Sequence, residues 1–122
     1  MSEIRATTIS NAAGTGPITM TGQSAAKAWN SFNGTGTIAF IKSFNGSSLV
    51  DVGTGEYDVN ITSAMDSTNY SILASAGLNV VHNASDTLGY PNTTTQYSVA
   101  HWENNGKQDI VYISGQINGD LA

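Results

Sequence analysis

The feature of the sequence that most restricts its fold is the spacing of turn residues between short β-type runs within residues 28–62. Three runs are rich in β-branched and aromatic residues: Thr37–Phe44, Ser47–Val52 and Glu56–Thr62. Asn45-Gly46 separates the first two runs and favours a type I′ hairpin turn, which needs positive φ at both central positions. Gly53-Thr54-Gly55 supplies the next turn. The pattern predicts a three-stranded meander.

The third run indicates how its side chains are divided between two faces. Apolar and polar residues alternate along it, with Tyr57, Val59 and Ile61 on one face and Glu56, Asp58 and Asn60 on the other. Because neighbouring side chains of a strand point to opposite faces, this alternation predicts a sheet with one buried and one solvated side.

The remainder of the domain also consists mainly of predicted strands. Four further runs have strand character: Asn69–Ala76, Leu78–His82, Thr94–Glu103 and Lys107–Ile117. Asn104-Asn105-Gly106 predicts a hairpin between the last two, whereas Asn83–Thr93 lacks an apolar period and predicts the longest loop. The alanine run in Gln23–Trp29 predicts a helical turn. About seven strands with frequent turns favour an all-β fold, a small antiparallel β-sandwich or barrel.

The N-terminal residues differ from the rest of the chain. Gly14, Gly16 and Pro17 interrupt a weak alternation of polar and apolar residues. This predicts an extended arm over residues 1–21, followed by a single β-sandwich domain at residues 22–122. The arm is either an ordinary unfolded terminus or a docking or subunit-exchanging segment. Its expected docking residues are Ile4, Arg5, Ile9 and Ile18.

Large apolar side chains outside the arm are candidates for the core or for contacts between subunits. We expect Trp29 and Phe32 to introduce the first strand and to pack on the core. The run Lys107–Ile117 is apolar on both faces, as expected for a strand inside a sandwich or at a subunit interface. The residues assigned to core or oligomer packing are Trp29, Phe40, Val111 and Ile113.

Composition and charge argue against several classes of function. The net charge is −5 and only four residues are Lys or Arg, so no basic stripe can follow a phosphate backbone, and we expect no nucleic-acid binding. No apolar run approaches the roughly 20 residues needed to cross a bilayer, and Met1–Ser10 lacks the apolar centre of a signal peptide. We therefore expect synthesis in the cytoplasm without membrane insertion. The chain has no cysteine, which excludes disulfides and thiolate zinc sites.

No arrangement of residues in the sequence predicts catalysis or a cofactor. His82 and His101 would form a metal site only if both converged with carboxylates such as Asp86 or Glu103, and structural or exposed histidines are the favoured interpretation. Glu56 and Asp58 resemble the paired carboxylates of a glycosidase, but a solvated row on one strand explains them more simply. Nucleophile elbows and phosphate-binding loops do not occur. We predict a non-enzymatic protein without catalytic residues, metal or cofactor.

A sugar-binding role would need aromatic side chains beside hydrogen-bonding groups. An aromatic face stacks on a sugar ring while amide and carboxyl groups bond the hydroxyls. The candidate glycan contacts are Trp102, Tyr90, His82 and Asn92. The alternative interpretation places Trp102 in the core or at a subunit interface.

Several short motifs point to a particular family. An Ala-Trp start and a Phe-Asn-Gly-Thr-Gly-Thr turn lie within Ala28–Thr37, and Asp51–Ile61 has the pattern Asp-x-Gly-Thr-Gly-Glu-Tyr followed by a Val-Asn-Ile strand. These motifs closely resemble a β-rich module of structural proteins from marine tailed bacteriophages. The opening SEIRATTISNAAGTGP resembles the leader of the same kinds of protein. The resemblance covers roughly residues 2–72 and, more loosely, the closing strand VYISGQINGD, but not residues 80–97.

The resemblance implies a homo-oligomer, with a trimer favoured, on the surface of a bacteriophage virion. Its partners would be its own copies and the capsid or tail proteins of the phage, after synthesis in the host cytoplasm. The implied role is a capsid decoration or cement protein, or a short fibre protein. The alternative role is a tail-fibre module that binds a host surface glycan for attachment.

Overall fold

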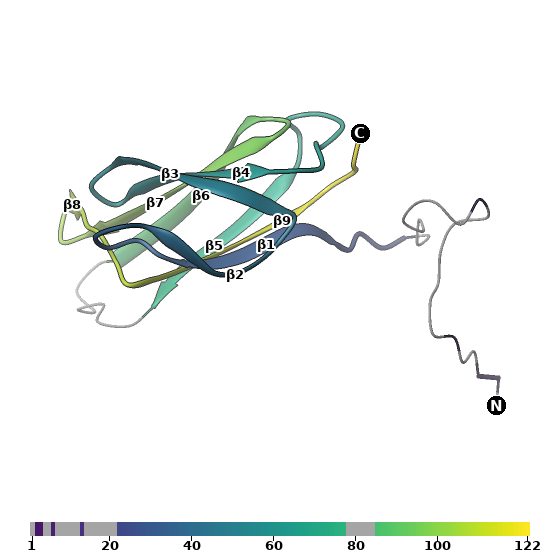
Figure 1. Cartoon of the computed structure of the whole chain (residues 1–122), viewed down its shortest axis with the longest axis horizontal. Coiled ribbons are helices and arrows are strands. Elements are labelled where there is room, and N and C mark those ends of the chain that lie inside the picture. Colours follow the sequence, from purple (N-terminus) through teal and green to yellow (C-terminus); the bar gives the residue numbers. More distant parts are fainter. Residues whose placement is uncertain (1, 4–5, 7–12, 14–21, 78–84) are drawn as a thin grey trace.

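The chain forms an all-β sandwich (Figure 1). The computed structural model describes residues 2–3, 6, 13, 22–77 and 85–122, which contain nine strands and no helix. In chain order the strands are β1 (Ala26–Asn33), β2 (Ala39–Phe44), β3 (Gly46–Gly53), β4 (Glu56–Ile61), β5 (Ser71–Gly77), β6 (Ser85–Thr93), β7 (Gln96–Glu103), β8 (Gly106–Lys107) and β9 (Tyr112–Asn118). The predicted fold class is therefore confirmed. The predicted docking residues Ile4, Arg5, Ile9 and Ile18 and the predicted strand Leu78–His82 lie outside the described residues.

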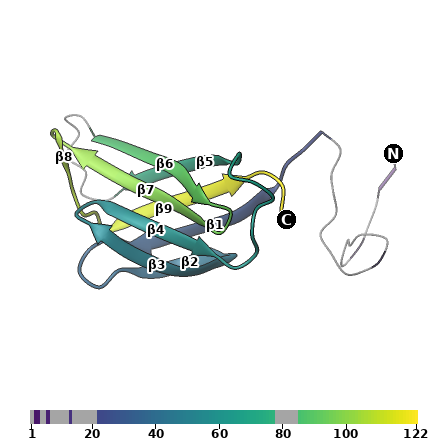
Figure 2. The same ribbon diagram turned by 90° about the horizontal axis from the view of Figure 1, so that it is seen from above.

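The strands form two antiparallel sheets that pack face to face (Figure 2). Sheet A has the order β2-β1-β9-β5, and sheet B has the order β3-β4-β7-β6, with β8 paired to the end of β7. β9, the last strand in sequence, lies between β1 and β5. The chain begins β1 and ends after β9 at the same end of the sandwich, because Ala26 pairs with Asn118.

The predicted helical turn at Gln23–Trp29 is wrong, because β1 begins at Ala26. Ala28, Asn30 and Phe32 alternate as buried residues along β1, which pairs on both edges, with β2 and β9. An alanine run of this length cannot sustain a helix alone, so pairing on two edges overrides its local propensity.

The predicted three-stranded meander is also wrong, because the chain changes sheet at Asn45. β2 pairs with β1 in sheet A, whereas β3 pairs with β4 in sheet B. Asn45 adopts a φ of 59°, but Gly46 stays at negative φ, so no type I′ turn forms. The Asn45 amide donates to the carbonyl oxygens of Lys27, at 3.0 Å, and Ser63, at 3.2 Å, and accepts from the Ser63 N–H at 2.7 Å. The asparagine therefore joins the two sheets at this corner.

The segment predicted as the longest loop, Asn83–Thr93, contains the nine-residue strand β6. β6 is the edge strand of sheet B and pairs with β7 from Glu103 to Gln96. An edge strand can contain proline because one row of its backbone groups needs no partner, and Pro91 lies there. The sequence of β6 lacks alternating apolar residues because most of its described side chains are exposed to solvent, and the segment was therefore predicted as a loop.

The run predicted as one strand, Lys107–Ile117, is divided between both sheets. β8 continues the confirmed hairpin at Asn104-Asn105, whose φ angles are 50° and 70°, and the chain then crosses to β9 in sheet A. The Asp109 carboxylate holds this crossing, because it accepts from the Gly55 N–H at 2.7 Å and lies 3.1 Å from the Tyr57 hydroxyl. The predicted turn at Gly53–Gly55 is confirmed, with Gly55 at a φ of 64°.

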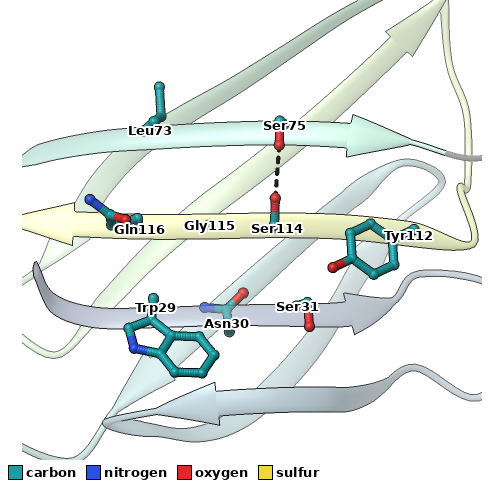
Figure 3. A pocket seen from close by; sticks show the side chains of 9 residues that line it. All are labelled: Trp29, Asn30, Ser31, Leu73, Ser75, Tyr112, Ser114, Gly115 and Gln116. Atoms are coloured by element: carbon teal, nitrogen blue, oxygen red, sulfur yellow. Dashed lines mark hydrogen bonds between the residues drawn. The ribbon is translucent and has the colours of Figure 1, made fainter.

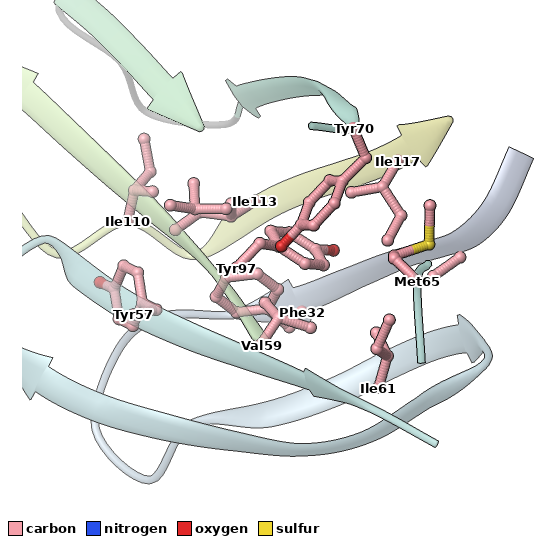
Figure 4. Close-up of a cluster of buried hydrophobic side chains, with 12 residues drawn as sticks. Phe32, Tyr57, Val59, Ile61, Met65, Tyr70, Tyr97, Ile110, Ile113 and Ile117 are labelled. Carbon is pink, nitrogen blue, oxygen red and sulfur yellow. The ribbon is translucent and has the colours of Figure 1, made fainter. Parts of the chain in front are cut away.

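The core lies between the sheets and is rich in aromatic side chains (Figure 4). Tyr57, Val59 and Ile61 are buried, as their alternation predicted. Phe32 packs edge-on against Tyr57, with ring centroids 5.3 Å apart. The other members of the buried cluster are Ala28, Met65, Tyr70, Tyr97, Val99, Ile110, Ile113 and Ile117.

The four residues assigned to core or oligomer packing divide between core and surface. Ile113 is buried, and Phe40 packs against the buried cluster. Trp29 and Val111 are exposed, so neither packs in the core, and their assignment to subunit contacts stays a prediction. The period-2 geometry explains Trp29: because Phe32 points inward, Trp29, three positions earlier, points outward.

The sheets approach each other most closely between β5 and β6. A Cβ atom on Gly89 of β6 would lie 2.3 Å from Ile72 Cγ2 and 3.5 Å from the Ala74 methyl group of β5. Glycine is therefore needed at position 89 because the opposite sheet occupies the space of a side chain.

We expect Gly89→Ala to destabilise the fold by about 1–3 kcal/mol, since an isoleucine branched at Cβ cannot easily move away. Gly53→Ala is the matched control, because a Cβ atom at Gly53 meets nothing within 4 Å. Urea denaturation of the two variants checks this. Equal midpoints for both variants would contradict the close approach of β5 and β6.

The buried phenol of Tyr97 should make stability depend on alkaline pH. Burial raises the pKa of Tyr97 to about 12, although the Asn30 amide, which donates to the hydroxyl, opposes the rise. A raised pKa in the folded state means full stability below about pH 10 and a loss as the pH rises toward 12, with a slope of up to about 1.4 kcal/mol per pH unit. Denaturation curves between these pH values measure the loss, which Tyr97→Phe should reduce. A free energy of unfolding independent of pH in this range would contradict the burial.

Candidate functional site

The outward faces of the two sheets differ in chemistry. We call A face the outward side chains of sheet A and B face those of sheet B. The A face includes Trp29, Ser31, Lys42, Phe44, Leu73, Ser75, Tyr112, Ser114 and Gln116. The B face includes Glu56, Asp58, Asn60, Leu88, Tyr90, Asn92, Gln96, Ser98, Trp102 and Lys107.

Three of the four predicted glycan contacts lie on the B face. Tyr90 is paired with Ser98, and Trp102 lies four residues further along β7, opposite Asp86. Asn92 lies near the other end, within hydrogen-bond distance of Ser98. The fourth contact, His82, lies outside the described residues. The three described members of the set are thus spread along the sheet.

The polar groups of the B face bond to one another. Tyr90 donates to Glu56 Oε1 at 2.9 Å, and the Lys107 ammonium forms an ion pair with the same carboxylate. The Lys107 Nζ also lies 5.5 Å from the centroid of the Trp102 ring, a cation–π distance. The predicted outward row of Glu56, Asp58 and Asn60 is confirmed, but its members are half-buried.

A second group of hydrogen bonds surrounds Asp58 on the same face. Its carboxylate accepts from the Asn92 amide at 3.1 Å and from the Ser98 hydroxyl. Gln96 donates to Asn60 at 3.0 Å, and Asn60 donates to Ser48 at 2.9 Å. These bonds use much of the donor and acceptor capacity of the B face.

The second predicted metal candidate, His101, is a core residue. Its Nδ1 lies 2.9 Å from the Thr87 hydroxyl, and its Nε2 is buried without a hydrogen-bond partner within the described ranges. Of the two carboxylates considered as its partners in a metal site, Asp86 is exposed and Glu103 is half-buried. In the part of the chain that the structure describes, no three His, Cys, Asp or Glu residues are grouped so that they could hold a metal ion.

The A face carries a pocket of 310 Å³ above the strands β1, β9 and β5 (Figure 3). Three rows of side chains across these strands build it. The first row is Trp29, Gln116 and Leu73, and the second is Ser31, Ser114 and Ser75. The third contains Tyr112 opposite Gly77. The serines therefore form a low floor between larger side chains.

The lining of the pocket combines aromatic rings with uncharged polar groups. Trp29 and Tyr112 are each 37% exposed and lie at opposite ends of the serine floor, with their ring faces toward the viewer in Figure 3. Leu73 is 71% exposed at one side. The hydroxyls of Ser75 and Ser114 share a 2.7 Å hydrogen bond. Among the residues that the structure describes, those that line the pocket carry no carboxylate, ammonium, guanidinium or imidazole group.

Sequence reasoning missed this site because its residues come from three distant segments. Residues 29–31, 73–75 and 112–116 become neighbours only when β9 inserts between β1 and β5. One signal was present: the spacing of Trp29 from Phe32 places the two side chains on opposite faces of one strand.

Comparison with protein-family models, curated proteins and solved structures gave no significant match to the chain. Among the described residues, no helix has the length and apolar character needed to cross a membrane.

The B-face ion pair makes a prediction about Glu56. Its pKa is lowered, first by the hydrogen bond from Lys107 and then by that from Tyr90. We expect Lys107→Met to raise the pKa of Glu56 toward its ordinary value and Tyr90→Phe to raise it less. NMR titration of the Glu56 side-chain carboxyl carbon measures both shifts. An unchanged pKa in Lys107→Met would show that the ion pair does not persist in solution.

Proposed function

We propose that the chain is a non-enzymatic structural protein of the bacteriophage virion surface, a capsid decoration or cement protein or a short fibre protein that acts as a homo-oligomer. The resemblance of residues 2–72 to virion modules supports this role. The structural observation that carries it is the open side of the sandwich, formed by the edge strands β2 and β3. Glu56 and Asp58, the carboxylates considered for catalysis, have their own hydrogen-bond partners, which is in keeping with a role without chemistry.

The open side exposes apolar side chains along two unpaired strand edges. β2 and β3 end their sheets on the same side and run close together along it (Figure 2). Ile41 is 59% exposed at the bulge of β2, and Val50 and Val52 of β3 are 44% and 52% exposed. Long apolar edges of this kind favour pairing with another chain unless they are covered.

The charges of the two edge strands favour a second copy of the chain as the covering partner. β2 carries one charged residue, Lys42, and β3 carries one, Asp51, and both are exposed. Placing β2 of one copy beside β3 of the next brings opposite charges together, whereas a two-fold β3–β3 contact would bring two aspartates together. Head-to-tail contacts close into a ring when the rotation fits, as in a trimer.

Assembly would give the protein its function through multiple identical contacts. In this proposal the arm at residues 1–21 docks on capsid or tail proteins, or on a neighbouring subunit. Three linked copies then bind a repeating surface with an effective concentration that one copy lacks. The receptor-binding alternative, recognition of a host glycan, is favoured by a different observation, the pocket of the A face.

Light scattering tests the oligomeric state. We expect the protein to have three times the 12.7 kDa mass of one chain, and the double variant Val50→Glu/Val52→Glu to have the mass of one chain. Leu88→Glu, at an exposed leucine of the B face, is the control and should stay oligomeric. A stable monomer for the unmodified protein, together with unchanged virion incorporation after deletion of residues 1–20, would contradict the proposal.

A further inference from the structure

We propose that the pocket of the A face binds an uncharged oligosaccharide, with Trp29 and Tyr112 as stacking surfaces and Ser31, Ser114 and Gln116 as hydrogen-bonding groups. This inference rests on the receptor-binding alternative of the proposed function and names its site and ligand class. It does not depend on assembly through β2 and β3, which lies at the edge of the sandwich.

The spacing of the side chains suits a ligand longer than one sugar ring. Successive outward residues of a strand are about 6.6 Å apart, so Trp29 and Tyr112, two rows apart, are separated by about 13 Å along the strands. The serines between them have short side chains and leave the space of the pocket open (Figure 3). A linear oligosaccharide can therefore stack on both rings while it passes over the serine floor.

The polar groups of the floor retain hydrogen-bonding capacity for a ligand. In the pair formed by Ser75 and Ser114 one hydroxyl donates to the other, so one O–H and several lone pairs remain free. Gln116 donates to Asn118 at 3.0 Å through one N–H, which leaves its carbonyl oxygen and a second N–H. Sugar hydroxyls both donate and accept, and they match such groups.

The described lining residues carry no charge, which argues for a neutral ligand. An acidic sugar would need Lys or Arg beside its carboxylate, and Lys42, which lies opposite Ser31 on the A face, does not line the pocket. The net charge of −5 repels polyanions as well. A purely apolar ligand would remove water from three serine hydroxyls and offer no hydrogen bonds in place of those that the water made. The C–H faces and hydroxyls of a neutral pyranose satisfy both kinds of surface.

The two tryptophans of the chain allow the two faces to be tested separately, because Trp29 lies on the A face and Trp102 on the B face. Trp102→Phe leaves Trp29 as the fluorescent reporter, and Trp29→Phe leaves Trp102. The full-length variants are titrated with cellotriose, maltotriose, laminaritriose and mannotriose, and with trigalacturonate as the charged comparator. We expect a saturable change in emission with at least one neutral trisaccharide when Trp29 is the reporter, and none when Trp102 is.

Further variants assign the binding to the pocket. Saturation-transfer NMR should show at least about tenfold weaker binding for Trp29→Ala and for Tyr112→Ala, and unchanged binding for Leu88→Ala on the B face. Circular dichroism establishes that each variant is folded. Because both aromatic residues are exposed, we expect both variants to fold, and one folded variant is enough for the test. The monomeric variant Val50→Glu/Val52→Glu should bind with unchanged affinity, which separates this proposal from the oligomer.

Any of four results would overturn the assignment. The first three are no binding of any of the four neutral trisaccharides, preferential binding of trigalacturonate, and a response reported by Trp102 alone. A loss of binding in the monomeric variant would also overturn it, because the ligand would then need the subunit interface.

Discussion

The architecture depends on two polar side chains that hold the chain where it passes from one sheet to the other. Asn45 joins the start of β1 to the segment after β4 through Lys27 and Ser63, at the end of the sandwich that contains the C-terminus. Asp109 joins the β3–β4 turn to the segment before β9. The neighbouring Gly34 N–H donates to the Ile110 carbonyl oxygen at 3.0 Å, which places this contact at the far end of β1. At one end the Asn45 side chain satisfies backbone groups of Lys27 and Ser63, and at the other the Asp109 carboxylate accepts from the Gly55 N–H while the backbone of Ile110 bonds that of Gly34.

These crossings decide which surfaces the molecule presents. The crossing at Asp109 sends β9 into sheet A, where it lies between β1 and β5 and completes the floor of three serines. On the outward face of sheet B, Glu56 and Asp58 bond to side chains of the neighbouring strands. Many polar groups of the B face are therefore occupied by their own contacts, while the A face presents aromatic rings and serine hydroxyls. The open edges of β2 and β3 form a third, separate surface.

Local pattern predicted those features of the fold that depend on neighbouring residues. The alternation of Tyr57, Val59 and Ile61 identified the buried face of β4, and the turn at Asn104-Asn105 was recognised from residues that tolerate positive φ. Features that depend on distant pairing were not predictable in this way. Asn45-Gly46 has the composition of a hairpin, yet the partners of β2 and β3 lie in different sheets. The edge strand β6 was not predicted, because its sequence lacks the alternation of apolar and polar residues by which a half-buried strand is recognised.

The candidate site was unpredictable for the same reason, since no window of sequence contains more than one of its three strands. The sequence analysis named Trp102 among the sugar-binding candidates, whereas Trp29 was expected to pack on the core or at a subunit contact. Whether Trp29 lies in the core or on the surface depends on which face of β1 packs against the core. The central claim is therefore that β5 and β9 are neighbours and that their serines form the floor of the A face.

Engineered cysteines test this claim most directly, because the chain contains none of its own. In the variant Ser75→Cys/Ser114→Cys the two sulfur atoms replace hydroxyls 2.7 Å apart. We predict that mild oxidation of the dilute protein forms an intramolecular disulfide, detected by mass spectrometry of the linked peptides. The control Ser75→Cys/Ser48→Cys, with its thiols on opposite faces, should remain reduced. Failure of the first pair to link under conditions that oxidise free thiols would contradict the arrangement of sheet A.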